Sequence, residues 1–148
     1  MARRSDAAAS TCPVARSADL LGDRWALLIV RDAFDGMRRF SDFQRSLGAA
    51  RNILADRLKR LVEADILALQ PASDGSAYQE YVLTPRGEQL FPLVVALRQW
   101  GERHLFARGE PHSLLLDVRS GRALAPMVAR DAQGEVIAPA DTRVRKPR

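Results

Sequence analysis

Residues able to recognise a polar or charged partner gather on one predicted helix that begins at Arg51. At about 100° per residue, its apolar side chains form a single stripe, which comprises Leu54, Leu58, Leu61 and Val62. The opposite face is polar and carries Asn52, Asp56, Lys59 and Glu63, with Arg60 and Ile53 beside them, Arg57 on the flank and Arg51 in the first turn. Amide and guanidinium groups can form bidentate hydrogen bonds to purine edges, and further cations can contact phosphates. The face is therefore a candidate DNA-reading surface, while a solvated face with an Asp56–Arg60 ion pair is the simpler alternative.

Positive charge is concentrated around this helix. The chain has a formal net charge of +5 over 148 residues. Between positions 38 and 60 the sequence has seven cations and two acids, and the cations are Arg38, Arg39, Arg45, Arg51, Arg57, Lys59 and Arg60. A uniform excess of arginine would follow from a GC-rich genome, but a local excess favours an anionic partner, nucleic acid first.

The elements around the Arg51 helix predict a helix-turn-helix followed by a wing. Ser41 and Gln44 have the spacing of a capping box, which predicts a short helix ending near Gly48. Beyond Ala64, residues 66–70 and 78–83 alternate between apolar and polar, and the turn-forming segment PASDGSA separates them, so a β-hairpin is expected. In this geometry the second helix enters the major groove, N-terminal end first.

Further helices are predicted on both sides of this core. Proline at a first helical position and glycine at an end predict a helix over 13–21, and apolar spacing predicts another over 24–34. Thr84-Pro85 predicts the start of one helix continuing to about Phe106. Residues 108–142 have the pattern of short strands, and turns are expected at Gly121 and Gly134. The segments around these two glycines resemble each other, which indicates either a weak repeat or a chance similarity.

The expected fold class is α+β and mostly helical, a winged helix-turn-helix with a C-terminal β-hairpin extension. The expected domains are a disordered tail (1–11), a DNA-binding and dimerisation domain (12–107), a β extension (108–142) and a basic tail (143–148). The helix from Pro85 has more apolar positions than a one-sided helix needs, and the first helix is too short to be stable alone. A homodimer is therefore expected.

The order of motifs resembles the HxlR family of bacterial transcriptional regulators, relatives of the MarR group. The motifs are CPV from Cys12, LLGDRW from Leu20, RFSDF from Arg39, LADRLKRL from Leu54, YVLTPRG from Tyr81, and Trp100. The resemblance implies a winged-helix homodimer on a palindromic operator, with the Arg51 helix as recognition helix and residues 73–77 as the wing. By this resemblance and the face described above, the expected DNA-binding residues are Arg38, Arg39, Ser41, Arg51, Asn52, Ile53, Asp56, Arg57, Lys59 and Arg60.

The chain departs from the family pattern at two places. Relatives often carry a capping serine where this chain has Ala49-Ala50, and the wing here has Asp74 but no cation between Gln70 and Arg86. No metal or cofactor is expected, because Cys12 is the only cysteine and the cysteine pairs of some longer relatives do not occur.

Cys12 is a candidate redox sensor. With Pro13 as the first helical residue, Cys12 becomes the N-cap, close to free N–H groups and to Arg16, a setting that activates thiols. The resemblance implies the same, since some family members sense oxidants with the matching cysteine. The alternative is a small cap residue packed at the dimer interface. A single cysteine per chain allows an intersubunit disulfide or a mixed adduct.

Other function classes fit less well. No apolar run approaches the length of a membrane span, and no apolar segment follows the N-terminal arginines as in a signal peptide, so a cytoplasmic protein is expected. An enzyme with a Cys-His nucleophile would need His104 or His112 beside Cys12, which no spacing indicates. The remaining alternative is a winged helix that contacts proteins without binding DNA.

Overall fold

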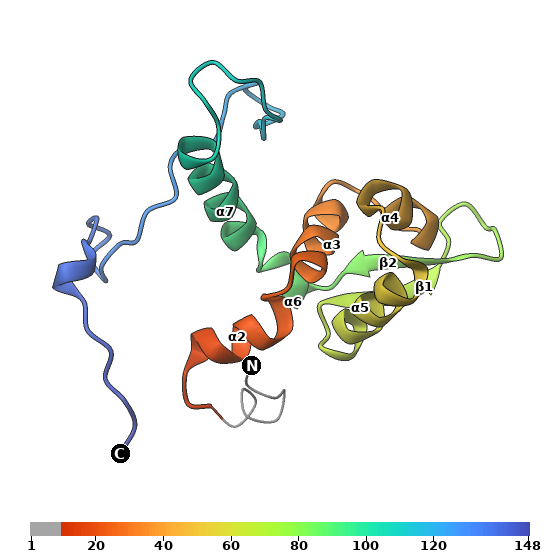
Figure 1. Ribbon diagram of the computed structural model, residues 1–148, viewed down its shortest axis with the longest axis horizontal. Helices are drawn as coiled ribbons and strands as arrows, with labels where there is room; N and C mark the ends of the chain where they lie inside the picture. Colours follow the sequence, from red (N-terminus) through yellow and green to blue (C-terminus); the bar gives the residue numbers. More distant parts are fainter. Residues whose placement is uncertain (1–9) are drawn as a thin grey trace. The chain divides into compact units, whose positions relative to one another are not determined.

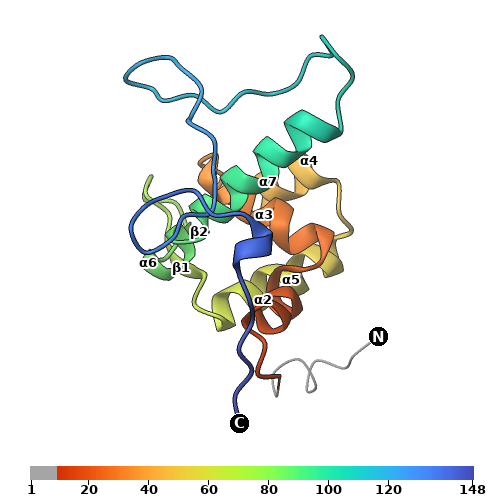
Figure 2. The ribbon, with the colours of Figure 1, turned by 90° about the vertical axis from the view of Figure 1, so that its left-hand side faces the viewer.

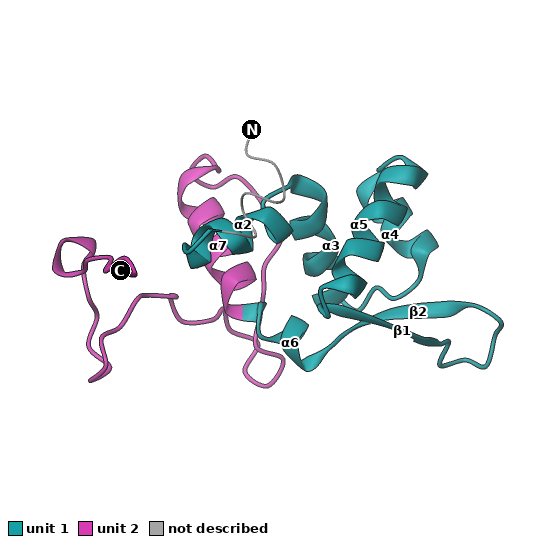
Figure 3. Cartoon of the chain, turned by 90° about the horizontal axis from the view of Figure 1, so that it is seen from below, with its two compact units in different colours: residues 1–91 teal, residues 92–148 magenta. Residues whose placement is uncertain are grey.

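The computed structural model describes residues 10–148. Along the chain they divide into two compact units, with the boundary between Phe91 and Pro92 (Figure 3). Positions 1–9 of the predicted tail lie outside the described residues. The predicted domain boundaries at 107/108 and 142/143 remain predictions. Within the described chain, no helix has the length and apolar character needed to cross a membrane.

The first unit begins with four helices. They are α2 (Pro13–Leu21), α3 (Arg24–Phe34), α4 (Phe40–Leu47) and α5 (Arg51–Glu63). The predicted bounds of α2 and α3 are confirmed. Both helices begin where predicted because the side chains of Cys12 and Asp23 cap their first turns. The Cys12 sulfur accepts a hydrogen bond from Ala15 N at 3.4 Å, and Asp23 Oδ1 accepts one from Ala26 N at 2.7 Å.

Helix α4 begins earlier than predicted. Ser41 is its second residue, and the N-cap is Arg39, whose backbone N–H donates to Asp42 Oδ2 at 3.4 Å. The prediction of Ser41 as cap was wrong because the acidic group three residues after Arg39 satisfies this N–H. At the other end, Gly48 takes a left-handed conformation, with φ 64°, and donates its N–H to Gln44 O. This glycine turn allows α5 to start within three residues.

The core of the first unit is where α3, α4, α5 and the first strand meet. Its fully buried side chains include Ile29, Val30, Phe43, Leu54, Leu58, Leu61 and Leu67. Three of the four residues of the predicted α5 stripe are thus buried, and Val62 is half-buried. Because this stripe packs inward, the opposite face of α5 is directed away from the core.

The wing is a two-stranded antiparallel sheet, β1 (Leu67–Pro71) and β2 (Gln79–Leu83), paired from Leu67↔Leu83 to Pro71↔Gln79. Figure 1 shows it extending beside α4 and α5. Contacts of Tyr81 help to join it to α4 and the residues before that helix. Tyr81 N donates to Arg38 O at 2.7 Å, and the Tyr81 ring packs edge-on against Phe43 with centroids 6.3 Å apart. The wing therefore has a defined position on the helix-turn-helix.

The helix predicted from Pro85 to Phe106 is interrupted. Thr84 and Pro85 do start a helix, α6 (Pro85–Glu88), in which Thr84 Oγ1 accepts a bond from Gly87 N at 3.0 Å. The chain leaves the helical path at Gln89–Leu90, and α7 (Phe91–His104) follows. A Cβ on Gly87 would lie 2.2 Å from Ile66 O, so this position requires glycine where a capping box would have glutamate.

The second unit consists of α7 and the chain that follows it. Beyond α7 the chain runs as loops, apart from the short 3₁₀ helix η1 (Pro139–Asp141), as Figure 2 shows. The predicted turns occur, since Gly121 and Gly134 have positive φ values. Each turn closes a single bridge, Leu116↔Ala123 and Arg130↔Val136, so the predicted strands reduce to isolated pairs. Among the described residues of this unit, Val95 is the only apolar residue whose side chain is buried.

Candidate nucleic-acid interface

The exposed face of α5 is polar, as predicted. Arg51, Asn52, Asp56 and Lys59 are exposed, and Ile53 is half-buried. Ala50 caps the helix without a side-chain hydrogen bond, so the first N–H groups of α5 have no side-chain acceptor. Arg51 lies over the ring of Phe40, with its guanidinium carbon 5.2 Å from the centroid. The N-terminal half of α5 thus presents hydrogen-bonding groups and a cation on one surface.

Two other predicted residues of α5 turn toward α2 and α3. Arg57 Nε lies 2.9 Å from Asp23 Oδ2, and its NH1 lies 2.6 Å from Asp56 Oδ2. Arg60 NH2 donates to Asp19 O at 3.1 Å, and its NH1 lies 3.8 Å from Asp23 Oδ2. The Asp56–Arg60 ion pair of the alternative interpretation does not form, because Asp56 pairs with Arg57 and Arg60 lies near the carboxylate that caps α3.

This setting changes the chemistry of Arg57. Its side chain is 23% exposed. Burial works to lower the pKa of Arg57, but the contacts with Asp56 and Asp23 outweigh it and raise that pKa above its ordinary value. Arg57 and Arg60 therefore fix α5 against the preceding helices.

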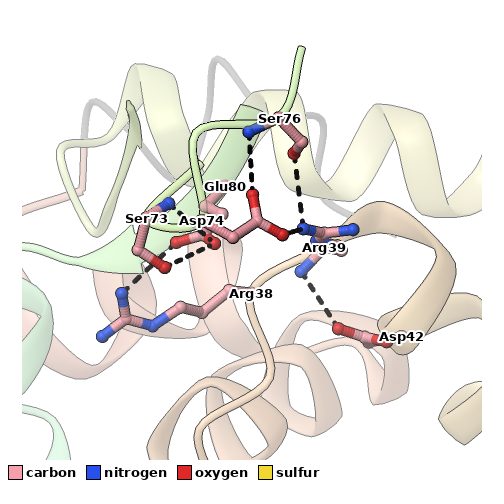
Figure 4. Close-up of polar contacts among 7 residues, drawn as sticks. All are labelled: Arg38, Arg39, Asp42, Ser73, Asp74, Ser76 and Glu80. Carbon is pink, nitrogen blue, oxygen red and sulfur yellow. Dashed lines mark hydrogen bonds and ion pairs between the residues drawn. The ribbon is translucent and has the colours of Figure 1, made fainter. Parts of the chain in front are cut away.

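Arg38 and Arg39 reach the wing (Figure 4). Arg38 NH1 donates to Glu80 Oε2 at 3.3 Å. Glu80 is 4% exposed and also accepts from Ser73 N at 3.2 Å and Ser73 Oγ at 3.1 Å. Burial works to raise the pKa of Glu80, but the bonds from Ser73 and Arg38 outweigh it and lower that pKa. The Glu80 carboxylate therefore stays ionised and holds the base of the wing loop.

Arg39 contacts the tip of the same loop. Its NH2 group pairs with Asp74 Oδ2 and donates to Ser76 Oγ at 3.4 Å. Its guanidinium carbon also lies 5.4 Å from the centroid of the Tyr78 ring. The bond from Ser76 N to Asp74 Oδ1, at 2.9 Å, and the nearby Arg39 lower the pKa of Asp74. An arginine from the start of α4 is thus the cation that the wing sequence lacks.

Four more carboxylates pair with cations of the basic segment. They are Asp23, Glu63, Asp74 and Glu80, which pair with Arg57 and Arg60, Lys59, Arg39 and Arg38, respectively. Arg45 pairs with Asp42 at 2.7 Å. Of the seven cations in this segment, Arg51 alone has no acidic partner among residues 10–148. The local charge seen in the sequence therefore overstates the free positive charge on this surface.

A groove of about 620 Å³ separates the helix-turn-helix from the wing. Its helical wall includes Arg39, Ser41, Gln44 and Arg51, and its wing wall includes Tyr78 and Tyr81. The predicted residue Ser41 is exposed here. The groove thus brings together two arginines, each beside an aromatic ring, a hydroxyl and an amide, which are donors that can contact a phosphate. Its lining also includes the apolar side chains of Phe40, Leu69 and Ala77.

Cys12 is an exposed free cysteine at the N-cap of α2. Arg16 directs its Nε to Ser10 O at 2.6 Å, and Ser10 Oγ accepts a bond from Cys12 N at 3.1 Å. The two histidines pack at a tilt against rings within the second unit, His104 against Trp100 and His112 against Phe106.

The sequence reasoning did not find every residue of this surface. The sequence pattern indicates Gln44 only as a capping residue and Tyr78 only as part of a strand, yet both side chains line the groove. Asp23 was part of a motif, but its pairing with Arg57 depends on a contact between residues 34 positions apart. An aromatic side chain at the end of a wing without cations was the one signal that could have identified Tyr78.

A short turn between α4 and α5, an exposed polar face on α5 and a hairpin wing together define a winged helix-turn-helix domain. Residues 20–108 match the sequence model of the HxlR-like helix-turn-helix family, and the chain belongs to that family. The predicted resemblance is confirmed.

Individual proteins agree with this assignment. The uncharacterized HTH-type transcriptional regulator Rv3095 of Mycobacterium tuberculosis is 45% identical over 92 residues, which are 62% of this chain and 58% of that relative. This chain therefore spans little more than half the length of that curated relative.

Solved structures show the same fold. The crystal structure of PA1607, a proposed transcription factor, has 50% sequence identity and a TM-score of 0.88, and the match covers 94% of this chain and 97% of that one. The redox regulator HypR in its reduced form is 27% identical, with a TM-score of 0.58 over 64% of this chain and 94% of HypR.

Proposed function

We propose that this protein regulates transcription by binding a palindromic DNA operator as a homodimer. The observation that carries the proposal is the exposed face of α5, where Arg51 and Asn52 stand at the helix start while Leu54 and Leu58 anchor the helix in the core. In a winged helix, this end of the second helix enters the major groove.

The predicted DNA-binding residues other than Arg39 divide into three groups by their partners. Asn52 would read an adenine edge, Ile53 would contact a thymine methyl group, and Asp56 would accept from a cytosine amino group. Ser41, Arg51 and Lys59 would contact phosphates, assisted by the uncapped N–H groups at the start of α5. Arg38, Arg57 and Arg60 would position the wing and the recognition helix through Glu80 and Asp23.

Dimerisation is supported by the apolar surface of α7. Leu93, Leu97 and Trp100 are exposed at positions four and three residues apart, so they lie on one face of the helix. Val14 of α2 is 75% exposed. Apolar patches of this kind mark interaction sites, and a second copy of the chain would cover them.

Footprinting on the DNA upstream of the protein's own gene tests this function. We expect two protected half-sites whose centres lie about 10 base pairs, or a multiple of this, apart. Sedimentation at micromolar concentration should give about twice the chain mass of 16.4 kDa. A dimer that protects no DNA and binds no duplex would instead support a winged helix used only for protein contacts.

Cys12 supports a second proposal, that oxidants regulate this DNA binding. Its thiol is exposed and accepts a hydrogen bond from the first turn of α2, and the similar protein HypR is described as a redox regulator. Two thiols, one from each subunit, would lose two protons and two electrons to the oxidant and form an intersubunit disulfide. Alternatively, each Cys12 thiol would form a mixed disulfide with a small thiol, again with loss of two protons and two electrons to the oxidant.

A further inference from the structure

The two arginines that precede α4 hold the wing loop in different ways. Arg38 meets Glu80, a carboxylate that is 4% exposed and also binds Ser73. Arg39 meets Asp74, a carboxylate whose side chain is 55% exposed at the tip of the loop (Figure 4). One ion pair is therefore built into the base of the wing, and the other lies at the surface.

The loop does not depend on Arg39 for its shape. Ala72 N donates to Tyr78 O at 3.0 Å and closes the loop, and Gly75 N donates to Ala72 O at 3.2 Å. Asp74 Oδ1 accepts from Ser76 N and forms an Asx turn. Arg39 contacts only side chains of the loop, namely Asp74, Ser76 and Tyr78. Its guanidinium can therefore leave Asp74 while the backbone of the loop stays folded.

The position of Arg39 matches that of a phosphate contact. It lines the groove between the helix-turn-helix and the wing together with Ser41, Gln44 and Arg51. A DNA strand that leaves the major groove beside α5 must pass the wing, and these donors suit its backbone. In the free protein the exposed carboxylate of Asp74 pairs with Arg39.

We infer that the groove binds a backbone phosphate of duplex DNA through Arg39. In the free protein the Asp74 carboxylate forms an ion pair with this arginine and competes with the phosphate for it. On binding, the Arg39 guanidinium exchanges the Asp74 carboxylate for a phosphate oxygen, and Asp74 turns to solvent. Exposed ion pairs are weak, whereas a phosphate contact releases condensed counterions, so the exchange favours the complex. Asp74 thereby weakens binding to every sequence equally and limits occupation of non-operator DNA. This inference rests on the DNA binding proposed above.

The test measures the affinity of the full chain for a labelled random-sequence duplex at several salt concentrations. Asp74→Asn retains an oxygen for the Ser76 N–H but has no charge for Arg39. We expect it to bind about two- to fivefold more tightly than the wild type, the range given by the loss of one exposed ion pair. Its salt slope should equal that of the wild type, because Arg39 reaches the phosphate in both. Arg39→Ala should weaken binding and reduce the slope by about 1.

Asp117→Asn is the matched control for net charge. Asp117 is also a loop aspartate whose carboxylate accepts the N–H two residues on and contacts an arginine, Arg119, but it belongs to the second unit. The Asp117→Asn variant should bind the random-sequence duplex with the same affinity as the wild type. The double variant Arg39→Ala/Asp74→Asn should bind like Arg39→Ala alone, because Asp74 acts only through this arginine.

The outcomes separate this inference from the proposed function. If Asp74→Asn binds no better than Asp117→Asn, or more weakly than the wild type, the carboxylate does not compete with phosphate and the inference is wrong. If the gain persists without Arg39, it is a general charge effect and the inference is equally wrong. In each of these cases wild-type DNA binding still stands, whereas a wild type that binds no duplex overturns both.

Discussion

Replacement of Arg57 by alanine tests the role that the structure gives to an arginine of the recognition helix. Its pair with Asp23, at 2.9 Å and with the arginine side chain 23% exposed, lies between the buried and exposed extremes. We assign about 1 kcal/mol to this pair and at most about 0.5 kcal/mol to the more exposed pair with Asp56. Arg57→Ala should therefore lower the free energy of unfolding by about 1–1.5 kcal/mol, measured by urea denaturation.

Lys59→Ala is the matched control on the same helix. Lys59 is 76% exposed, and its nearest acid, Glu63, is 4.0 Å away. Its removal should leave stability within about 0.5 kcal/mol of the wild type, because surface substitutions rarely do more. If Lys59 contacts a phosphate, its removal should reduce the salt slope of DNA binding by about 1, whereas Arg57→Ala should leave the slope unchanged.

A double-mutant cycle identifies the partner. Asp23→Asn keeps an oxygen for the N-cap bond to Ala26 but loses the charge that Arg57 faces. The two single losses of stability should therefore sum to more than the loss in the double variant, by about 0.5–1 kcal/mol. The reasoning is refuted if Arg57→Ala is as stable as the wild type while its salt slope falls by about 1, since Arg57 would then be a phosphate contact.

Other positions give predictions of the same kind. Asn52→Ala should cost about 1–3 kcal/mol on the operator and little on random duplex, and an equal loss on both in a binding titration would exclude base readout. Gly87→Ala should lower the melting temperature sharply, because the new Cβ would lie 2.2 Å from Ile66 O; an unchanged melting temperature would mean that α6 shifts freely. Cys12→Ser keeps a competent N-cap and should bind DNA normally. Mild oxidant should produce a covalent dimer and an altered affinity only in the wild type, and oxidised wild type with unaltered affinity would make Cys12 structural.

Local patterns predicted most of the first unit. Periodicity located α3 and the buried stripe of α5, and the residues Cys12, Gly22 and Thr84 marked helix ends correctly. These features depend on neighbours within a few positions along the chain, which a sequence displays directly. The cap of α4 was misplaced because Ser41 and Asp42 both offer an oxygen, and the choice between them depends on the path of the incoming chain.

The break between α6 and α7 illustrates a different limit. Apolar residues continue at helical spacing across Gln89 and Leu90, so the pattern alone favours one helix. Contacts of Thr84 and Gly87 with the start of the hairpin, such as the bond from Thr84 N to Ile66 O at 3.0 Å, hold α6 in place. Such contacts join residues far apart in the sequence and have no local signal.

The sequence by itself determined the helix-turn-helix, the wing and the polar face of α5, because each follows from spacing and composition within a short segment. Only the tertiary structure decided which cations on that surface are free. Charges interact through space, and folding brought Asp23, Asp74 and Glu80 to arginines that the sequence places 34, 35 and 42 positions away. Arg57 and Arg38 thereby became parts of the scaffold, and Arg51 was left as the unpaired cation of the segment within residues 10–148.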